Sequence, residues 1–335
     1  MRDRENRDVT VYDFLMRSNP DHAPKKPIVY FLDKIVALHN VADFSNTEKW
    51  DTKKEKVTYI RDIEIIEIDN QKKSICLLLY FADKKGMGAS FTNMENHKQE
   101  NITLEGDKAR PESAHILISL EQNHGNGISY IGIVEDSSKL NRQKIQSYLC
   151  FLMKKIQSSS ITDFEALDEG GAKEKDGKLK KYKFYNSIEL QGHPSDNLMH
   201  YIENGKLTGI ALESSDNSKF PVGDGKYVLP KRQELLLEPA KGKWSEDPIS
   251  RLTEAIKIGK QNNYETARVI FNSDDGKSHT ARMDIETEGI VGDHFVKKLR
   301  LKGFSVILNE ADDRINSEIK NQMISILKDT QRGGA

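Results

Sequence analysis

Lysine and arginine residues gather beside aromatic residues in four segments of the chain, residues 49–56, 226–232, 241–244 and 295–302. Cationic side chains neutralise the phosphates of nucleic acids, and neighbouring rings can stack on the bases. If the fold brings these segments together, they form a groove for DNA or RNA. The alternative is a set of ordinary solvated lysines, because a chain with 51 basic residues contains clusters in any case.

Three of these segments supply the nucleic-acid contacts that we predict. The predicted contacts are Lys53, Lys54, Lys231, Arg232, Lys297, Lys298, Arg300 and Lys302. The formal net charge is -1, from 51 basic and 52 acidic residues, which excludes a protein held on nucleic acid by bulk charge. A local patch can still bind phosphates, since the charges near the ligand matter more than the total.

Residue spacings typical of catalytic sites are weaker evidence for a function than the basic and aromatic segments. Arg110 and His115 match the R-x4-H spacing of HEPN-type ribonucleases, in which both residues lie at a helix start. Here Pro111 follows the arginine, and His115 opens an apolar, strand-like run. We therefore expect a loop arginine and a histidine at the start of a strand.

A metal-dependent nuclease stays open as an alternative, because a fold can bring together acids that are distant in sequence, Asp275 and Asp293 among them. The nine histidines show no metal-ligand spacing, and no nucleophile or phosphate-loop motif occurs. We accordingly predict no catalytic residue, no metal ligand and no cofactor.

The two cysteines and the N-terminus indicate the compartment. Cys76 and Cys150 lie in apolar runs without metal-ligand spacing, which predicts buried thiols in a reducing environment. The first residues are charged and lack the apolar stretch of a signal peptide, and the longest apolar runs are too short to span a bilayer. We expect a cytoplasmic protein.

The elements that must position these residues form two blocks. In the first, strands are predicted at 58–68, 74–82, 114–120 and 128–134, followed by a helix whose apolar stripe runs from Ile145 to Ile156. Residues 157–183 are highly charged and show no periodicity, which is typical of a linker. In the second block, strands are predicted at 184–190, 207–213, 227–237, 266–271, 281–290 and 304–308. Helices are predicted at 197–203, from 248 and from 315.

Blocks of strands with few helices favour an α+β fold. At 335 residues we expect two mainly antiparallel-sheet domains, each covered by helices. The predicted domains are 1–156 and 184–330, joined by the charged linker 157–183.

The order of these elements resembles that of RexA-like phage-exclusion proteins. GISYIGIVEDSSKLNRQKIQSYLCFLM, a strand, a polar turn and a helix, precedes a lysine-rich stretch, and ELQGHPSDNLMHYIENGKLTGIALES then gives strand, short helix and strand. The resemblance covers most of the chain and lies in element order, not in a motif. It implies a cytoplasmic, DNA-associated sensor with a membrane partner, and no catalytic residue carries over.

We therefore predict a nonenzymatic nucleic-acid-binding sensor or adaptor of a bacterial anti-phage defence system. The expected partners are DNA or RNA, a membrane or effector protein, and further copies of the chain in a homo-oligomer. Two alternatives remain at this point: a metal-dependent nuclease effector, and a protein-interaction subunit of a defence complex that binds no nucleic acid.

Overall fold

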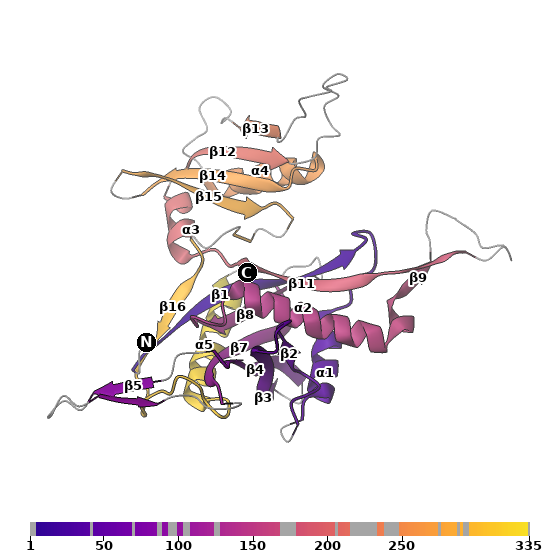
Figure 1. Ribbon diagram of the computed structural model, residues 1–335. Coiled ribbons are helices and arrows are strands. Elements are labelled where there is room, and N and C mark those ends of the chain that lie inside the picture. Colours follow the sequence, from indigo (N-terminus) through magenta and orange to yellow (C-terminus); the bar gives the residue numbers. More distant parts are fainter. Residues whose placement is uncertain are drawn as a thin grey trace, which may run out of the picture. The chain divides into compact units, whose positions relative to one another are not determined.

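The computed structural model describes residues 5–40, 43–68, 71–85, 89–92, 99–102, 108–123, 128–167, 179–204, 207–214, 233–237, 248–273, 276–286, 289–290 and 295–333 (Figure 1). The chain divides into two units. Unit 1 comprises Met1–Thr10, Phe14–Leu190 and Leu299–Ala335, and unit 2 comprises Val11–Asp13 and Gln191–Lys298. The chain thus leaves unit 1 and returns to it, so these bounds differ from the domains 1–156 and 184–330 expected from the sequence.

An eight-stranded sheet forms the centre of unit 1, with the strand order β11-β1-β8-β7-β4-β3-β2 and with β16 paired to β1. The strands are β1 (Arg7–Asn19), β2 (Lys49–Trp50), β3 (Lys56–Ile68), β4 (Gln71–Asp83), β7 (Arg110–Gln122), β8 (Ser129–Glu135), β11 (Tyr185–Gly192) and β16 (Lys298–Leu301). A separate hairpin joins β5 (Ala89–Thr92) and β6 (Gln99–Ile102). The pairs from β2 through β8 are antiparallel, and with the helices they confirm the α+β class.

The apolar patterns explain the places of the strands. Residues 75–81 of β4 are buried without interruption, so both faces of this strand need cover, and it lies between β3 and β7. In β3 apolar and charged residues alternate in part, and this strand lies near the end of the sheet. The strands predicted at 58–68, 74–82, 114–120 and 128–134 are confirmed as β3, β4, β7 and β8.

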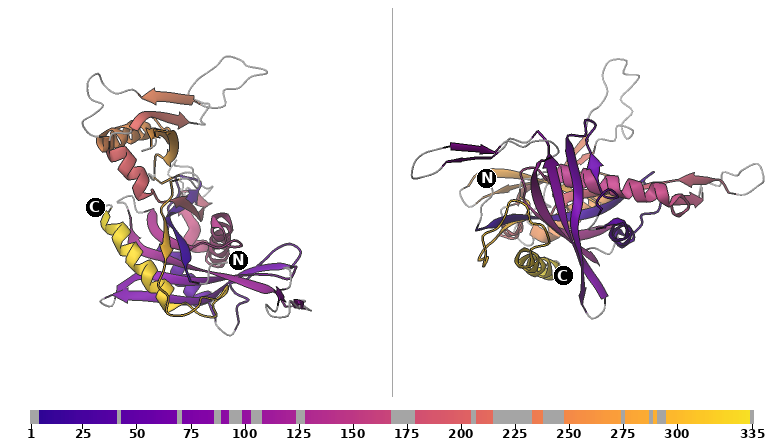
Figure 2. Two further views of the ribbon diagram at one scale, coloured as in Figure 1. Left: turned by 90° about the vertical axis from the view of Figure 1, so that its left-hand side faces the viewer. Right: turned by 60° about the horizontal axis from the view of Figure 1, so that its bottom comes forward.

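Helices cover both faces of the sheet. Tyr80 and Phe81 are consecutive in β4 and therefore point to opposite faces. The Tyr80 hydroxyl donates to the Asp312 carbonyl, just before α5 (Ser317–Gly333), whereas Phe81 lies beneath Lys144 of α2 (Arg142–Ser159). On its face α5 packs against β7 and β8, and Figure 2 shows it along the sheet. On the other, α2 contacts α1 (Ile28–Leu38).

The first strand, β1, was not predicted. Its burial is almost complete, and Val9, Phe14 and Leu15 are fully buried. Four polar residues are also buried inside it: Arg7, Thr10, whose hydroxyl donates to Asp136 (2.6 Å), Asp13 and Ser18. Because polar and apolar residues are buried together, the sequence shows no clean strand period here.

The region predicted as a linker, 157–183, belongs in its described parts to unit 1. It contains η1 (Ile161–Phe164), β9 (Glu165–Leu167) and β10 (Lys181–Lys183), and residues 168–178 lie outside the described residues. Gln157 is buried and exchanges two hydrogen bonds with the backbone of Asn186 (2.7 and 2.9 Å). Phe164 packs against Phe31 and Phe184. A few well-placed contacts hold this segment, although its composition is mostly polar.

Unit 2 contains a four-stranded antiparallel sheet in the order β13-β12-β14-β15. The elements are α3 (Asp196–Glu203), β12 (Leu207–Ser214), β13 (Gln233–Leu237), α4 (Pro248–Gln261), β14 (Thr266–Asn272) and β15 (Ser278–Asp284). Every second residue of β14 is buried, and these residues share a core with α3 and α4. The predicted helices at 197–203 and from 248 are confirmed, and Ser195 caps the first by accepting the Leu198 N–H.

The strand predicted at 304–308 is wrong. Residues 302–308 have no regular structure, and Val306 and Ile307 are exposed (60% and 71%). Gly303 has a positive φ of 75°, which turns the chain, and the Ser305 N–H donates to Glu318 in the first turn of α5 (2.9 Å). The Ser305 N–H is therefore bonded to a side chain of α5 and is not available to pair with a neighbouring strand.

Both cysteines are free thiols, Cys76 buried and Cys150 half-buried, and burial raises the pKa of each. The prediction of buried thiols thus holds fully for Cys76 and in part for Cys150. In the described part of the chain, no helix has the length and apolar character needed to cross a membrane.

Candidate functional site

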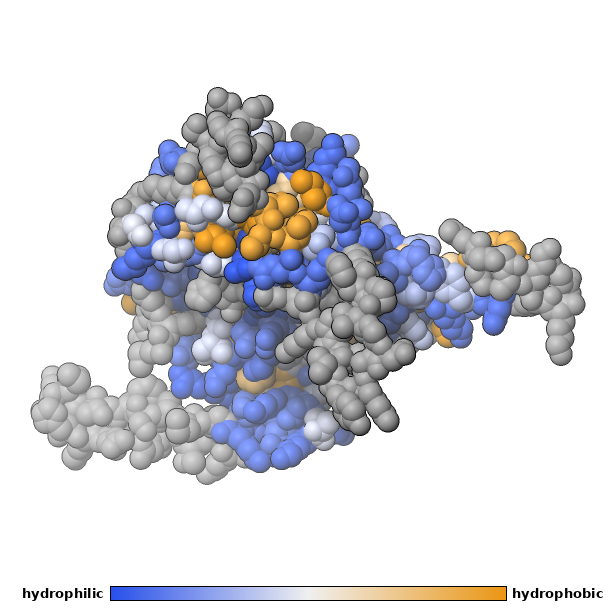
Figure 3. All heavy atoms as spheres, turned by 90° about the horizontal axis from the view of Figure 1, so that it is seen from above, coloured by the Kyte–Doolittle hydropathy of each residue, from blue (hydrophilic) through white to orange (hydrophobic). Residues whose placement is uncertain are grey.

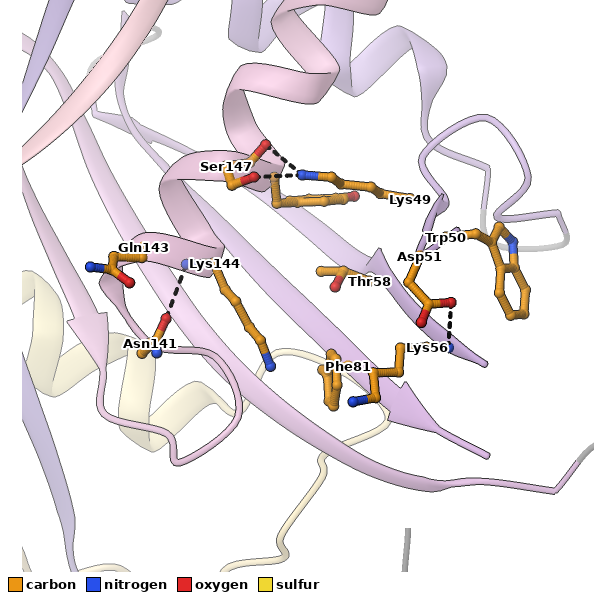
Figure 4. Close-up of a pocket in the computed structure, with 11 residues that line it drawn as sticks. Lys49, Trp50, Asp51, Lys56, Thr58, Phe81, Asn141, Gln143, Lys144 and Ser147 are labelled. Atoms are coloured by element: carbon orange, nitrogen blue, oxygen red, sulfur yellow. Dashed lines mark hydrogen bonds between the residues drawn. The ribbon is translucent and has the colours of Figure 1, made fainter. Parts of the chain in front are cut away.

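A pocket of about 400 Å³ opens in unit 1 where α2 begins, beside β2 and the start of β3 (Figure 4). It contains the first of the basic and aromatic segments found in the sequence. Its lining includes Lys49, Trp50 and Lys56 from that segment, together with Phe81 of β4 and Lys144 of α2. With Tyr148 of α2, three ammonium groups and three ring systems therefore surround one cavity.

Lys144 is placed by the start of α2. Asn141 caps this helix by accepting the Lys144 N–H through its side chain (3.0 Å), which directs the lysine side chain into the pocket (Figure 4). The Lys144 ammonium lies 4.0 Å from the centre of the Phe81 ring, a cation–π distance. Burial and the nearby charges of Lys56 and Lys139 lower its pKa. No described carboxylate forms an ion pair with it.

Lys49 enters the same pocket from β2. Its ammonium donates to the backbone carbonyl (2.9 Å) and the hydroxyl (2.7 Å) of Ser147, one turn further along α2. Burial lowers the pKa of this lysine too. Its described partners are a neutral serine and the ring of Phe151, 5.8 Å away, so no described carboxylate balances its charge.

The acidic groups at the pocket are already engaged. Asp51 accepts the backbone N–H groups of Glu55 (2.8 Å) and Lys56 (3.1 Å), and these bonds lower its pKa. Asp83 lies 3.5 Å from the Lys56 ammonium. The first turn of α2 adds the partial positive charge of a helix N-terminus. The balance in the pocket is positive, which suits an anionic ligand.

Trp50 provides an exposed ring at the mouth of the pocket. Its side chain is 40% exposed, and its indole N–H donates to Glu48 (2.8 Å), which fixes the ring. The Lys84 ammonium lies 5.7 Å from the ring centre. A fixed, exposed indole next to ammonium groups can stack on a planar, negatively charged ligand.

Lys53 and Lys54 lie in the tight turn between β2 and β3, next to the pocket but not among its lining residues. Both are exposed, and Lys54 has a positive φ of 53°. The Lys54 N–H donates to the Asp51 carbonyl (3.1 Å), which closes the turn. These two predicted contacts are thus available to a ligand that extends out of the pocket.

Acids balance two of the four cations in the predicted cluster at 297–302. Lys297 pairs with Asp196 (2.9 Å), and Arg300 binds Asp8 through two hydrogen bonds (2.7 and 3.0 Å). Lys298 and Lys302 are exposed. The other two predicted contacts, Lys231 and Arg232, lie outside the described residues, as do Asp275 and Asp293 of the nuclease alternative.

The R-x4-H spacing of Arg110 and His115 has a structural explanation. Both residues lie in β7, so the expected loop at Arg110 is wrong, and His115 lies inside the strand instead of at its start. Arg110 pairs with Glu310 (2.6 Å). His115 is completely buried, its Nδ1 lies 2.7 Å from Glu135, and its Nε2 accepts the Asn316 N–H (2.9 Å). A histidine so enclosed cannot reach a nucleic-acid substrate.

Sequence reasoning missed the lining residues outside the segment 49–56, which are Thr58, Phe81, Asn141, Gln143, Lys144, Ser147 and Tyr148. Tyr148 was assigned to the buried stripe of α2, and Phe81 to a central strand. The one available signal was the position of Lys144 three residues after a capping asparagine, which places a cation at a helix start. Nothing in the sequence connects that helix to residues 49–56.

Comparisons of the chain with protein-family models, curated proteins and solved structures find no match. The resemblance to RexA-like proteins therefore stays a prediction. Within the described residues, no group of three or more histidine, cysteine, aspartate or glutamate side chains is placed to hold a metal ion. The geometry of the pocket itself is the basis for a function.

Proposed function

We propose that this protein binds nucleic acid, without cleaving it, through the pocket at the start of α2. The observation that carries the proposal is the position of Lys49 and Lys144, which bring two ammonium groups into one cavity without a described carboxylate partner. Partial burial lowers the pKa of both lysines, because it disfavours the charged ammonium unless an anion compensates it. A phosphate group in the pocket would supply that compensation.

The exposed ring of Trp50 favours a single-stranded nucleic acid over a duplex as the ligand. Trp50 is exposed at the mouth and can stack on an unpaired base, whereas bases inside a duplex are already stacked on each other. Phosphates at Lys49 and Lys144 and a base on Trp50 fit a single strand. Lys53 and Lys54 in the adjacent turn would then contact the strand as it leaves the pocket.

Fluorescence anisotropy with a labelled single strand, a duplex and an RNA, across a salt series, tests this proposal. Lys144→Glu is expected to weaken single-strand binding about tenfold and to reduce the salt slope by about 1. Lys154→Glu is the matched control, because Lys154 is an exposed lysine on the same helix. It should leave the affinity within about twofold.

The remaining outcomes separate the alternatives. Absence of binding at low salt contradicts the proposal and favours a protein-interaction subunit. Shortening of the probe only with Mg²⁺ favours a metal-dependent nuclease. Equal weakening by the variants of Lys144 and Lys154 would place the contacts outside the pocket.

We propose further that this binding serves a sensor or adaptor in anti-phage defence. The support is the resemblance of the predicted element order to that of RexA-like phage-exclusion proteins. Cells that express the protein are expected to form fewer phage plaques than cells that carry an empty vector, and Lys144→Glu should abolish the difference. Protection by the Lys144 variant would separate defence from nucleic-acid binding.

A further inference from the structure

The strands β9 and β10 form a short antiparallel hairpin in unit 1, in which Leu167 lies opposite Lys181 and Glu165 opposite Lys183. A backbone hydrogen bond from Phe184 to Phe164 (3.0 Å) continues this pairing toward β11. Successive residues of a strand point to opposite faces. The two faces of this hairpin can therefore be assigned from the register.

One face of the hairpin is turned toward unit 1. Phe164 and Phe184 belong to it, are buried (3% and 2%), and contact each other and Phe31. Tyr182, two residues before Phe184, packs against His22. This aromatic contact fixes the hairpin and directs its other face to solvent.

The opposite face is unusual for a surface exposed to water. Its members, which we name the outer strip, are Glu165, Leu167, Leu179, Lys181, Lys183 and Tyr185. The exposed fractions of Leu167, Leu179 and Tyr185 are 51%, 40% and 55%. The hairpin extends away from the sheet of unit 1 in Figure 1, and Figure 3 shows apolar side chains on it, at the right of the view.

We infer that the outer strip binds the surface of a lipid bilayer that contains anionic lipids. Leucine side chains and a tyrosine ring suit the boundary between headgroups and acyl chains. Lysine side chains extend their ammonium groups to lipid phosphates while their methylene stems stay with the apolar residues. Alternation along one strand places both kinds of side chain on the same strip.

The charges along the strip agree with an anionic surface. Glu165 is the acidic residue that the register places on this face of β9, and it lies 3.8 Å from the Lys181 ammonium. Lys183 is exposed and has no described ion-pair partner, whereas the exposed Lys180 belongs by alternation to the other face. The described part of the hairpin therefore presents a cationic excess beside its leucines.

Two other ligands fit less well. A stable protein interface buries about 800 Å² on each partner, and this strip lies on one short two-stranded hairpin. Single-stranded nucleic acids gain from aromatic rings and cations, while exposed leucines contribute little to them. The inference is independent of the pocket at α2, which lies elsewhere in unit 1 and uses different residues.

Vesicle flotation tests the inference with the full chain. Vesicles of phosphatidylcholine mixed with phosphatidylglycerol are expected to bind the protein about tenfold more tightly than vesicles of phosphatidylcholine alone, because each lysine near an anionic surface adds attraction. Leu167→Ser with Leu179→Ser should lower that affinity about tenfold. Lys181→Glu with Lys183→Glu should lower it similarly and reduce its salt dependence.

A matched control uses the exposed leucines of unit 2. Leu235 and Leu236 in β13 are 38% and 67% exposed, so Leu235→Ser with Leu236→Ser removes the same side chains elsewhere. This control should change vesicle binding less than twofold, and the Leu167 and Leu179 variant should keep the melting temperature and any nucleic-acid binding of the unchanged protein. Lack of binding to anionic vesicles, or equal loss in both leucine variants, would overturn the inference.

Discussion

Unit 1 contains two groups of charges, one fully buried and one at a pocket open to solvent, and it treats them in opposite ways. In the first, Arg7, Glu135 and His115 are buried in the sheet, and each is bonded to another part of the protein. In the second, Lys49 and Lys144 line a pocket, and their described contacts are with a serine and with rings. The comparison suggests two uses of charge, one for stability and one for a ligand.

The three buried side chains form a continuous network of contacts across β1, β7 and β8. The Arg7 Nε lies 2.9 Å from one oxygen of Glu135, and the other oxygen lies 2.7 Å from His115 Nδ1. Because the Asn316 N–H is a donor, His115 Nε2 must accept it, which places the ring proton on Nδ1. Asn316 in turn caps α5 by accepting the Ile319 N–H (3.2 Å). This buried network thus links β1, β8 and β7 to the C-terminal helix α5.

The largest effect on stability is expected where a substitution interrupts this buried network. Glu135→Gln leaves the Arg7 guanidinium buried without its counter-charge, and should lower the free energy of unfolding by about 3–5 kcal/mol. Urea unfolding followed by circular dichroism measures this. Glu121→Gln is the control, because Glu121 pairs with Lys73 at the surface and should cost less than about 1 kcal/mol. Equal losses of unfolding free energy in the two variants would mean that the buried network stabilises the protein no more than a surface ion pair does.

A smaller effect is expected at the ring of the pocket, where binding and not stability should change. Trp50→Ala removes the stacking surface and should weaken single-strand binding by about tenfold, within the range for one stacked base. Trp50→Phe keeps a ring and should recover most of the affinity. The melting temperature should stay unchanged in both variants, because the side chain is exposed. If alanine and phenylalanine behave alike, stacking plays no part in the binding.

The smallest expected effect is a pH dependence of stability that arises from a carboxyl group beside the buried network. Asp312 is half-buried, and burial raises its pKa above the ordinary 3.8, with the nearby charge of Glu135 adding to the shift. The folded state therefore holds this proton more tightly than the unfolded state. The resulting contribution to stability is complete below the ordinary pKa and is lost as the pH rises through the raised value.

Asp312→Asn should remove this dependence on pH. The variant is expected to gain stability relative to the unchanged protein as the pH rises from 3.8 to neutrality. Urea unfolding of both proteins across that range provides the measurement. A stability difference that does not vary with pH would show that Asp312 does not titrate differently in the folded state.

Much of the secondary structure could be predicted because its signals are local. The uninterrupted apolar run in β4, the stripe of α2 and the capping serine before α3 each mark an element within a few residues. Elements without such signals were missed or misjudged. The strand β1 buries Thr10 and Asp13 together with its apolar residues, and residues 304–308 are apolar but lie exposed beside α5.

The candidate site was predictable only in part for the same reason. The cluster of lysines with Trp50 was visible in the sequence, and it lies at the pocket. The sequence did not distinguish it from residues 297–302, where Asp196 and Asp8 neutralise two of the cations. Those acids are 101 and 292 residues away from their partners in the chain, so no local pattern reveals the pairs.

The sequence by itself determined the mixture of helices and strands, the absence of excess charge and the segments that could contact phosphates, because periodicity and composition act over short distances. The tertiary structure alone decided which cations are balanced and which are not. A buried histidine at a ribonuclease-like spacing came to accept the N–H of Asn316, the capping residue of α5, and a lysine at the start of α2 came to lie over Phe81. Charge pairing depends on distance in space, and only the folded chain sets that distance.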